Sequence, residues 1–385
     1  MLLGEGQEMK KIINAKVMTP YRYLEGYDVA YENRKIVKID KNIENCEEII
    51  DGKGLFLAPG YIDLHIHGGG GYSFIEENEA AVSHAMDEVV KHGVTSVLAS
   101  HMVPVKKLGD IYQEYMKNTE GPEILGLHAE CVDWEYIYGD PINKGKEASD
   151  YSVEKCKKIV EEIPVIKRIG IDPCIKGADE ITRYFVSNGV SVSISHCGPA
   201  DYTQVMKCVE AGANSVTHLY TGMSGFYRDA DTGERFPGLI EDCLLEPDIY
   251  AEVIGNGKHL TGSMLDLIYR NKGVHGMYLV TDAATREEPF AEGEEMVVPN
   301  RLPDRISIKT MAPMDYIVQK TYQYSNIPLL DVIRMATLTP AQVIGVDDHK
   351  GKICEGYDAD FILLDKELNI KAVIARGRTC KGLEE

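Results

Sequence analysis

The chain has 385 residues, 44% of them hydrophobic, which is enough for one large domain with a buried core and a smaller domain beside it. A formal net charge of −20 argues against nucleic acid or an anionic membrane as a partner, because both require a basic surface. The nine cysteines form no C-x-x-C pair, Met1–Lys10 lacks the apolar core of a signal peptide, and no run is long enough to span a membrane. We therefore expect a cytoplasmic protein with reduced thiols.

The first segment, from residue 11 to about residue 58, has the pattern of short strands separated by turns. The predicted strands are Lys11–Val17, Tyr27–Tyr31, Lys35–Ile39 and Glu48–Asp51. No helical pattern interrupts them. The segment is too short to form a good β core of its own, so we expect it to pair with strands from elsewhere in the chain.

Residues 60–71 read Gly-Tyr-Ile-Asp-Leu-His-Ile-His-Gly-Gly-Gly-Gly, and their apolar and polar residues alternate as in a strand with two distinct faces. His65 and His67 are two apart, so both imidazoles leave the same face. The glycines that follow keep side chains away from whatever the histidines hold. Two neutral imidazoles at the end of a strand are typical of a divalent metal site, although two ordinary strand histidines would give the same pattern.

From Gly60 onward, apolar runs alternate with amphipathic, charged segments. The predicted strands are Tyr61–His67, Thr95–Ser100, Ile124–Glu130, Lys167–Asp172, Ser191–His196, Ser215–Leu219, Ile249–Ile254 and Met277–Asp282. The predicted helices between them include Glu79–His92, Val153–Ile163, Ala178–Asn188, Tyr202–Ala211 and Ser263–Asn271. This order predicts a (β/α)8, TIM-like barrel, with an open doubly wound sheet as the alternative.

Polar residues fall at or near the C-terminal ends of five of these strands: His67, Glu130, His196, His218 and Asp282. In a barrel such ends converge on one mouth, where active sites of this architecture lie. Each residue taken alone also has an ordinary explanation, as an acid that caps a helix or as a histidine at a strand end whose hydrogen bonds are made within the protein. Their joint placement predicts a metal site at the mouth of the barrel.

A loop-rich region, Thr285–Arg305, and a helical pair, Leu329–Ala336 and Pro340–Ile344, follow the last predicted strand. The tail then returns to short strands within residues 352–365 and 370–376. The simplest geometry pairs these with the opening strands. We therefore predict a barrel of residues 59–340 and a small β-sandwich domain built from residues 1–58 and 341–385.

These residues resemble the amidohydrolase superfamily and, within it, the family of N-acetylglucosamine-6-phosphate deacetylases. The resemblance covers nearly the whole chain, and it rests on Leu57–Gly68, Gly126–Glu130, Ile194–His196, Thr217–Tyr220, Leu279–Ala283, Leu338–Ala341 and Gly356–Asp360. Many members of the superfamily bridge two metals with a carboxylated lysine, whereas the deacetylases use a glutamate at the position of Glu130. This glutamate favours the deacetylase branch.

The resemblance implies that His65 and His67 bind a first divalent metal and that Glu130 bridges to a second. It implies that His196 and His218 complete the second metal site. Asp282 matches the catalytic aspartate, which also touches the metal. The imidazole and carboxylate ligands suit Zn²⁺, Fe²⁺ or Mn²⁺, with one or two ions in each subunit.

The residues expected around the substrate depart from the family pattern. The resemblance assigns substrate contacts to Cys131, Thr221, Gly222, Arg235 and His259. Of these, Cys131, Thr221 and Gly222 differ from the residues usual in the family, and Glu147 stands where a carbonyl-polarising histidine is expected. Either the metal alone stabilises the oxyanion, another donor such as His101 replaces that histidine, or Glu147 does not correspond to it.

The expected reaction is metal-dependent hydrolysis of the acetamide of N-acetylglucosamine 6-phosphate, with Asp282 taking the proton of the attacking water and passing it to the leaving amine. A homodimer is expected if Arg235 reaches the phosphate bound by a neighbouring subunit. The same metal site would also serve another N-acyl amino sugar, an N-acyl amino acid or a cyclic amide. A non-catalytic binding homologue is the third alternative, although none of the expected metal ligands is lost.

Overall fold

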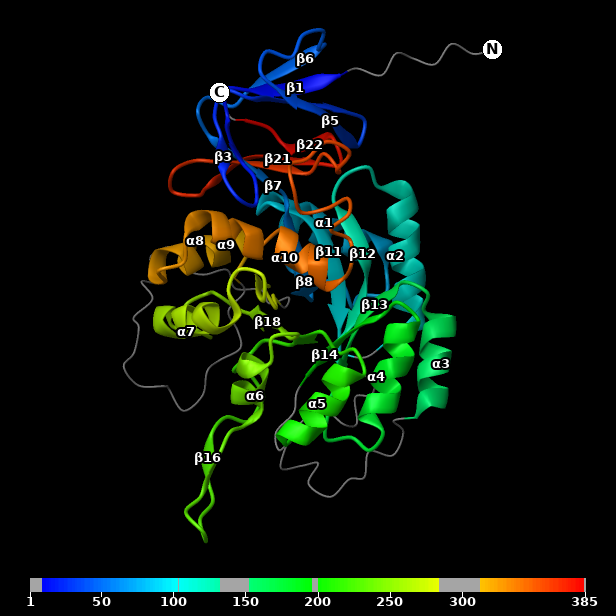
Figure 1. The fold of residues 1–385 in the computed structure, drawn as a ribbon. Helices are drawn as coiled ribbons and strands as arrows, with labels where there is room; N and C mark the ends of the chain where they lie inside the picture. Colours follow the sequence, from blue (N-terminus) through cyan, green and yellow to red (C-terminus); the bar gives the residue numbers. More distant parts are fainter. Residues whose placement is uncertain (1–8, 103, 132–151, 196–199, 284–311, 384–385) are drawn as a thin grey trace.

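Eight parallel strands form the central sheet of the computed structural model, which describes residues 9–102, 104–131, 152–195, 200–283 and 312–383 (Figure 1). In spatial order they are β8 (Tyr61–Ile66), β11 (Val94–His101), β12 (Glu123–Ala129), β13 (Ile166–Ile171), β14 (Ser191–Ile194), β15 (Ser215–Val216), β18 (Tyr250–Val253) and β19 (Met277–Leu279). Each of the eight predicted strands overlaps one of these. The sheet is nearly closed, as the predicted TIM-like barrel requires.

The first and last strands of this sheet meet just beyond the end of β19. Ile66 and Ala283 form an isolated parallel bridge. The amide of Asp282 donates to the carbonyl of His65 at 2.8 Å, and the amide of His67 donates to the carbonyl of Ala283 at 2.8 Å. These bonds bring the histidine strand directly beside the predicted catalytic aspartate.

Helices alternate with the barrel strands and bury their apolar faces against them (Figure 1). They are α1 (Glu79–Lys91), α2 (Lys106–Asn118), α3 (Val153–Glu162), α4 (Ala178–Ser187), α5 (Tyr202–Glu210), α6 (Leu239–Leu245), α7 (Gly262–Lys272) and α8 (Met314–Tyr324), followed by α9 (Leu329–Met335) and α10 (Leu338–Val343). The five helices predicted between the strands and the final helical pair are confirmed. The helices α2, α6 and α8 were not among those named from the sequence, and the loop-rich region predicted at 285–305 lies outside the described residues.

Two further sheets lie at one end of the barrel and combine strands from both ends of the chain (Figure 1). The six-stranded sheet has the order β22 (Arg378–Lys381), β21 (Ile370–Ala375), β20 (Phe361–Leu364), β7 (Phe56–Pro59), β2 (Lys16–Met18) and β3 (Tyr23–Leu24). The four-stranded sheet has the order β5 (Lys35–Asp40), β4 (Asp28–Glu32), β1 (Lys10–Ile13) and β6 (Glu48–Asp51). The antiparallel pairing of β20 with β7 confirms that the two ends of the chain join in one β structure, while the exact domain boundaries stay a prediction.

One predicted strand is wrong. The run Lys11–Val17 is not continuous, because Asn14 adopts a positive φ of 54° and breaks it into β1 and β2. The two halves then join different sheets. Asparagine enters this left-handed conformation more readily than most residues, and the side chain of Asn14 is held by a hydrogen bond that it donates to Asp51 at 3.0 Å.

Two short hairpins lie outside the central sheet. The strands β9 (Gly68–Gly69) and β10 (Tyr72–Ser73) fold back directly after the histidine strand. The strands β16 (Tyr227–Arg228) and β17 (Arg235–Phe236) form an exposed hairpin that projects from the barrel (Figure 1). Among the described residues, no helix is long and apolar enough to cross a membrane.

Candidate metal centre

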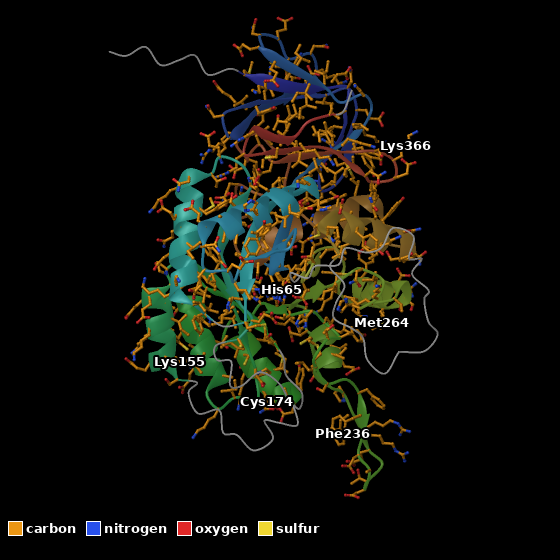
Figure 2. The ribbon with its side chains drawn as sticks, turned by 180° about the vertical axis from the view of Figure 1, so that it is seen from behind. His65, Lys155, Cys174, Phe236, Met264 and Lys366 are labelled. Carbon is orange, nitrogen blue, oxygen red and sulfur yellow. The ribbon has the colours of Figure 1, made fainter. Side chains whose placement is uncertain are left out.

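The histidine strand places His65 and His67 side by side at the C-terminal end of β8, inside the barrel (Figure 2 labels His65). Their ring centroids are 5.2 Å apart. The Nε2 atoms lie 3.3 Å and 2.9 Å from Oε1 of Glu130, which directly follows β12. Two imidazoles and one carboxylate thus converge from the ends of β8 and β12, which lie on either side of β11, as predicted.

Asp282 closes this cluster from the other side. Its Oδ1 atom lies 3.4 Å from Nε2 of His65 and 3.3 Å from Nε2 of His67. One ligand atom from each of His65, His67, Glu130 and Asp282 can be chosen so that all lie within 4.8 Å of one another. We call these four residues the mouth cluster. Asp282 has a positive φ of 48°, a strained conformation for a non-glycine residue that is common at functional sites.

His218 lies next to the mouth cluster. Its Nε2 atom is 3.9 Å from Oε2 of Glu130, and its ring centroid is 5.6 Å from that of His65. Its Nδ1 atom lies 3.1 Å from the carbonyl oxygen of Thr221, which can only accept a hydrogen bond. Nδ1 therefore carries a proton, and the neutral form of the ring has its lone pair on Nε2, on the side of Glu130. His196, the other ligand predicted for the second metal, lies outside the described residues.

The donor atoms of the mouth cluster fit a divalent cation. Nε2 of His65 is buried and lacks a hydrogen-bond partner within the described structure. Because Nδ1 of His65 bonds to a carboxylate oxygen of Glu252 at 2.8 Å, Nδ1 carries a proton, and the neutral form of the ring therefore has its lone pair on Nε2. An imidazole nitrogen that faces two carboxylates suits a cation, and imidazole with carboxylate is a donor set for Zn²⁺, Fe²⁺ or Mn²⁺.

The electrostatics of the mouth cluster also favour a bound cation. Burial disfavours protonated imidazole, yet the carboxylates of Asp282, Glu252 and Glu130 outweigh burial and raise the pKa of His65 well above its usual value. In the same way, Asp282 and Glu130 raise the pKa of His67 to about 9 against the effect of burial. Burial raises the pKa of Asp282, but the nearby histidines outweigh it, so the carboxylate stays ionised. The negative potential that would hold these protons would equally hold a metal ion.

A buried network behind His65 was not found from the sequence. Glu252 in β18 contacts His65, Arg168 in β13 and Tyr278 in β19, and all four side chains are buried. Burial disfavours the Glu252 carboxylate, but Arg168 and His65 hold its pKa well below the usual value. The signal in the sequence was the presence of charged residues within two strand-like runs, Lys167 and Arg168 in one and Glu252 in the other.

Asp63 was also missed as a part of the site. It lies two residues before His65 on the buried strand β8, and it accepts hydrogen bonds from the hydroxyl of Thr281 at 2.6 Å and from the amide of His65 at 3.2 Å. Burial raises the pKa of Asp63 to about 7 in spite of these bonds. Asp63 thus ties the histidine strand to the segment that carries Asp282.

Three of the predicted substrate residues lie close to the ligands. Cys131 follows Glu130 and is buried, and its thiol donates to the carbonyl of Met102 at 2.9 Å. Thr221 and Gly222 follow His218 in a turn, with the amide of Thr221 donating to the carbonyl of His218 at 2.8 Å. Gly222 has a φ of 66°, which favours glycine there.

His259 and Arg235 differ sharply in their surroundings. His259 is partly buried, its Nδ1 is 2.9 Å from Nδ2 of Asn256, and burial lowers its pKa while the charge of Asp282 opposes that shift. Arg235 is exposed on β17, and the adjacent Phe236 lies far from His65 in Figure 2. The structure therefore does not bring Arg235 to the mouth cluster of its own chain. Glu147 lies outside the described residues.

Comparison with known proteins gives consistent matches. Residues 197–380 match the model of the amidohydrolase family. The N-acetylglucosamine-6-phosphate deacetylase of Lysinibacillus sphaericus is 29% identical over 376 residues, covering 92% of this chain and 93% of that protein, and that of Caenorhabditis elegans is 29% identical over 360 residues, covering 86% and 83%. The crystal structure of the enzyme of that name from Pasteurella multocida superimposes with a TM-score of 0.79 at 25% identity, covering 96% of this chain and 99% of the other.

Proposed function

We propose that this chain, an amidohydrolase that resembles N-acetylglucosamine-6-phosphate deacetylases along nearly its whole length, hydrolyses the acetamide of N-acetylglucosamine 6-phosphate. The products are glucosamine 6-phosphate and acetate, as in amino-sugar catabolism. The observation that carries the proposal is the convergence of His65, His67, Glu130 and Asp282 at the barrel mouth of a chain with these relatives. The reaction needs an activated water and a proton carrier, and this cluster supports both.

The mouth cluster would hold the metal, with His218 and His196 extending it towards a second ion. A divalent ion bound there would lower the pKa of a water ligand towards roughly 7 and polarise the acyl oxygen of the substrate. We propose Zn²⁺, Fe²⁺ or Mn²⁺, because the donors are nitrogen and carboxylate oxygen without thiolate. This choice is supported by Cys131, the nearest thiol in the sequence, which donates to a backbone carbonyl instead of facing the cluster.

Asp282 is the proton carrier in this proposal. Its carboxylate is ionised, lies at the rim of the cluster and is 22% exposed, so a substrate can reach it. It accepts a proton from the attacking water and donates it to the departing nitrogen, which lets one group serve as base and then as acid. The bond between its amide and the carbonyl of His65 holds the carboxylate beside the ligands during both steps.

His259 and Arg235 are proposed to bind the sugar phosphate. His259 lies within reach of the charge of Asp282 and is held by Asn256, so its position is fixed near the reacting atoms. Arg235 stands on the projecting hairpin, where it is too exposed to serve the site of its own chain. We therefore propose a homodimer in which Arg235 reaches the phosphate bound by the neighbouring subunit.

The enzyme is proposed to work in the cytoplasm. The exposed Cys354 and the partly exposed Cys46 are free cysteines. Unpaired thiols at the surface persist in a reducing compartment and tend to oxidise outside it.

A second substrate class is favoured by one specific observation. The carbonyl of Thr221 is used to hold the ring of His218, and Cys131, Thr221 and Gly222 all differ from the residues expected around the sugar. Another N-acyl amino sugar, an N-acyl amino acid or a cyclic amide would use the same mouth cluster with a different set of contacts. The chemistry at Asp282 would stay the same.

A substrate panel tests the proposal. Acetate release from N-acetylglucosamine 6-phosphate is compared with release from N-acetylglucosamine, from N-acetyl amino acids and from other N-acyl amino sugars, with protein of known metal content. Turnover on the order of 1–10³ per second with the phosphorylated sugar, and much less without phosphate, is the expected result. Faster hydrolysis of an unphosphorylated amide would contradict it and favour the second class.

A further inference from the structure

One buried carboxylate connects two of the candidate metal ligands. Oε1 of Glu252 lies 2.8 Å from Nδ1 of His65 and accepts a hydrogen bond from the backbone amide of His218 at 3.1 Å. Oε2 of the same carboxylate accepts bonds from Arg168 at 2.5 Å and from the hydroxyl of Tyr278 at 2.8 Å. The Glu252 side chain is fully buried, so each of these bonds is shielded from water.

The two bonds to Oε1 act on different features of the ligands. The bond to His65 requires a proton on Nδ1, which leaves the lone pair on Nε2 pointing into the mouth cluster. The bond to His218 holds a backbone that is strained, with a φ of 27°. Glu252 is therefore in contact with the ring of one ligand and the main chain of another.

The two bonds to Oε2 keep this carboxylate in place. Arg168 also contacts Ser215 on β15, two strands away in the sheet, at 3.3 Å, so its guanidinium is fixed at two points. A buried ion pair seldom stabilises a fold more than apolar packing of the same volume would. The pair of Arg168 and Glu252 is thus poorly explained by stability alone, and its position directly behind His65 points to the site.

We propose that Glu252 is a positioning residue of the metal centre, anchored by Arg168 and Tyr278, that fixes the tautomer of His65 and the backbone of His218. Glu252 touches neither the substrate nor the reacting atoms. The inference rests on the metal centre of the proposed function and is independent of which amide is the substrate. Outer partners of metal-binding histidines typically change metal affinity by roughly 10- to 100-fold when they are lost.

Two variants test this role. Glu252→Gln keeps the size of the side chain, but its amide can present either an oxygen or an NH₂ group to His65 and so no longer dictates the tautomer. Because this leaves Arg168 buried without its partner, the double variant Arg168→Met with Glu252→Gln removes both charges and is the more decisive protein. Glu161→Gln, an exposed change on α3, and Asp360→Asn, a change in a buried ion cluster outside the site, are the matched controls.

The first readout is the affinity of the purified, metal-free proteins for Zn²⁺, measured by competition with a chelator. The second is the visible spectrum of Co²⁺ bound to each protein, which reports ligand geometry. We expect roughly 10- to 100-fold weaker Zn²⁺ binding and an altered Co²⁺ spectrum in both Glu252 variants, with neither change in the two controls. A merely structural role would lower thermal stability and leave the spectrum of the folded protein unchanged.

Zn²⁺ affinity within twofold of wild type and an unchanged Co²⁺ spectrum in the folded double variant would overturn the inference. If neither variant folds, Tyr278→Phe decides in the same way: weaker Zn²⁺ binding by a few fold supports the role of Glu252, and unchanged binding overturns it. The substrate proposal fails separately. One outcome is that wild-type protein binds Zn²⁺ through a Glu252-dependent site and yet releases no acetate from N-acetylglucosamine 6-phosphate. That result would contradict the proposed substrate and still support the positioning role of Glu252.

Discussion

The two ends of strand β12 carry two buried clusters of charged groups that differ in one respect. At its start, Glu123 lies 2.7 Å from Nζ of Lys350, which is also 2.9 Å from Asp358 and 2.9 Å from Asp360. Just past its end, Glu130 faces His65, His67 and Asp282. The first cluster contains a lysine cation, whereas the second consists of two imidazoles and two carboxylates whose ligand atoms converge without a lysine or arginine among them.

This difference matches the two ends of a barrel. Lys350 is only 1% exposed, and it joins the barrel strand to the segment leading into the terminal sheets, so the first cluster is complete and serves stability. The mouth cluster is at the C-terminal ends of the strands, where barrels place their active sites. A buried cluster of imidazoles and carboxylates with converging ligand atoms is therefore better evidence for a binding site than buried charge as such.

The largest expected effect separates chemistry from metal binding within the mouth cluster. Asp282→Asn removes the proton acceptor but keeps the size of the side chain, so kcat should fall by roughly 10²- to 10⁴-fold while metal content stays near that of wild type. Asp110→Asn, an exposed change on α2, is the matched control and should leave kcat unaltered. Activity retained within a few fold in Asp282→Asn would remove this residue from the proposed mechanism.

The next effect concerns the other end of β12. Lys350→Met removes the buried cation from a cluster of one buried and two partly buried carboxylates, so the free energy of unfolding should fall by about 3–5 kcal/mol in urea titrations. The metal affinity of the folded protein should not change, since the cluster lies away from the mouth. A loss below about 1 kcal/mol, or a lower metal affinity, would show that the two clusters are not separate in function.

A third prediction tests whether the mouth is completed by a second subunit. Arg235→Ala should raise KM for the phosphorylated sugar by roughly 10- to 100-fold with little change in kcat, because a charged hydrogen bond to phosphate is lost. Arg228→Ala, on the paired strand β16, is the control and should leave KM unchanged.

Mixing the Arg235→Ala protein with the Asp282→Asn protein extends this test. In a mixed dimer, one site would combine an intact Asp282 with an Arg235 supplied by the other subunit. Partial recovery of wild-type KM is expected. Mixtures that never exceed the activity of the separate proteins would argue against a contribution from the neighbouring subunit.

The smallest effect lies on the outside of the barrel. His92, which ends α1, is 3.1 Å from Asp315 in α8, and Asp315 raises the pKa of His92 against the opposing effect of burial. A raised pKa of histidine means that this pair stabilises the fold fully below the unfolded pKa of about 6.5, and that the stabilisation is lost as pH rises through the folded value.

Asp315→Asn should therefore lower the free energy of unfolding by at most about 1 kcal/mol at about pH 5.5, and by less at about pH 9. Urea titrations of wild type and variant at the two pH values give this difference. A destabilisation that is equal at both pH values, or larger at the higher one, would contradict the assigned role of the ion pair.

The sequence was sufficient for the barrel and for the four members of the mouth cluster because their signals are local. Apolar runs marked the strands, and a polar residue at the end of a run marked its position at the mouth. Helix α2 was harder to recognise, since it begins after Val105 without a capping side chain and contains Gly109. The break at Asn14 depended on one backbone conformation that the alternating pattern does not encode.

Glu252 and Arg168 could not be assigned from the sequence, because their partners are distant in the chain. Glu252 lies 187 residues from His65 and 84 from Arg168, and only the closed barrel brings them together. Each side chain taken alone is an unusual charge in a buried strand. The partners of Glu252 and Arg168, and hence their role behind His65, are seen only in the three-dimensional structure.

The most direct test of the central claim is a metal titration of the mouth cluster. Protein stripped of metal by a chelator is reloaded separately with Zn²⁺, Fe²⁺ and Mn²⁺, and bound metal and acetate release are measured on the same samples. We predict at least one tightly bound ion per subunit and activity that rises in proportion to occupancy. Full activity in the stripped protein, or tight metal binding that survives the loss of both His67 and Glu130, would contradict the assignment of this cluster.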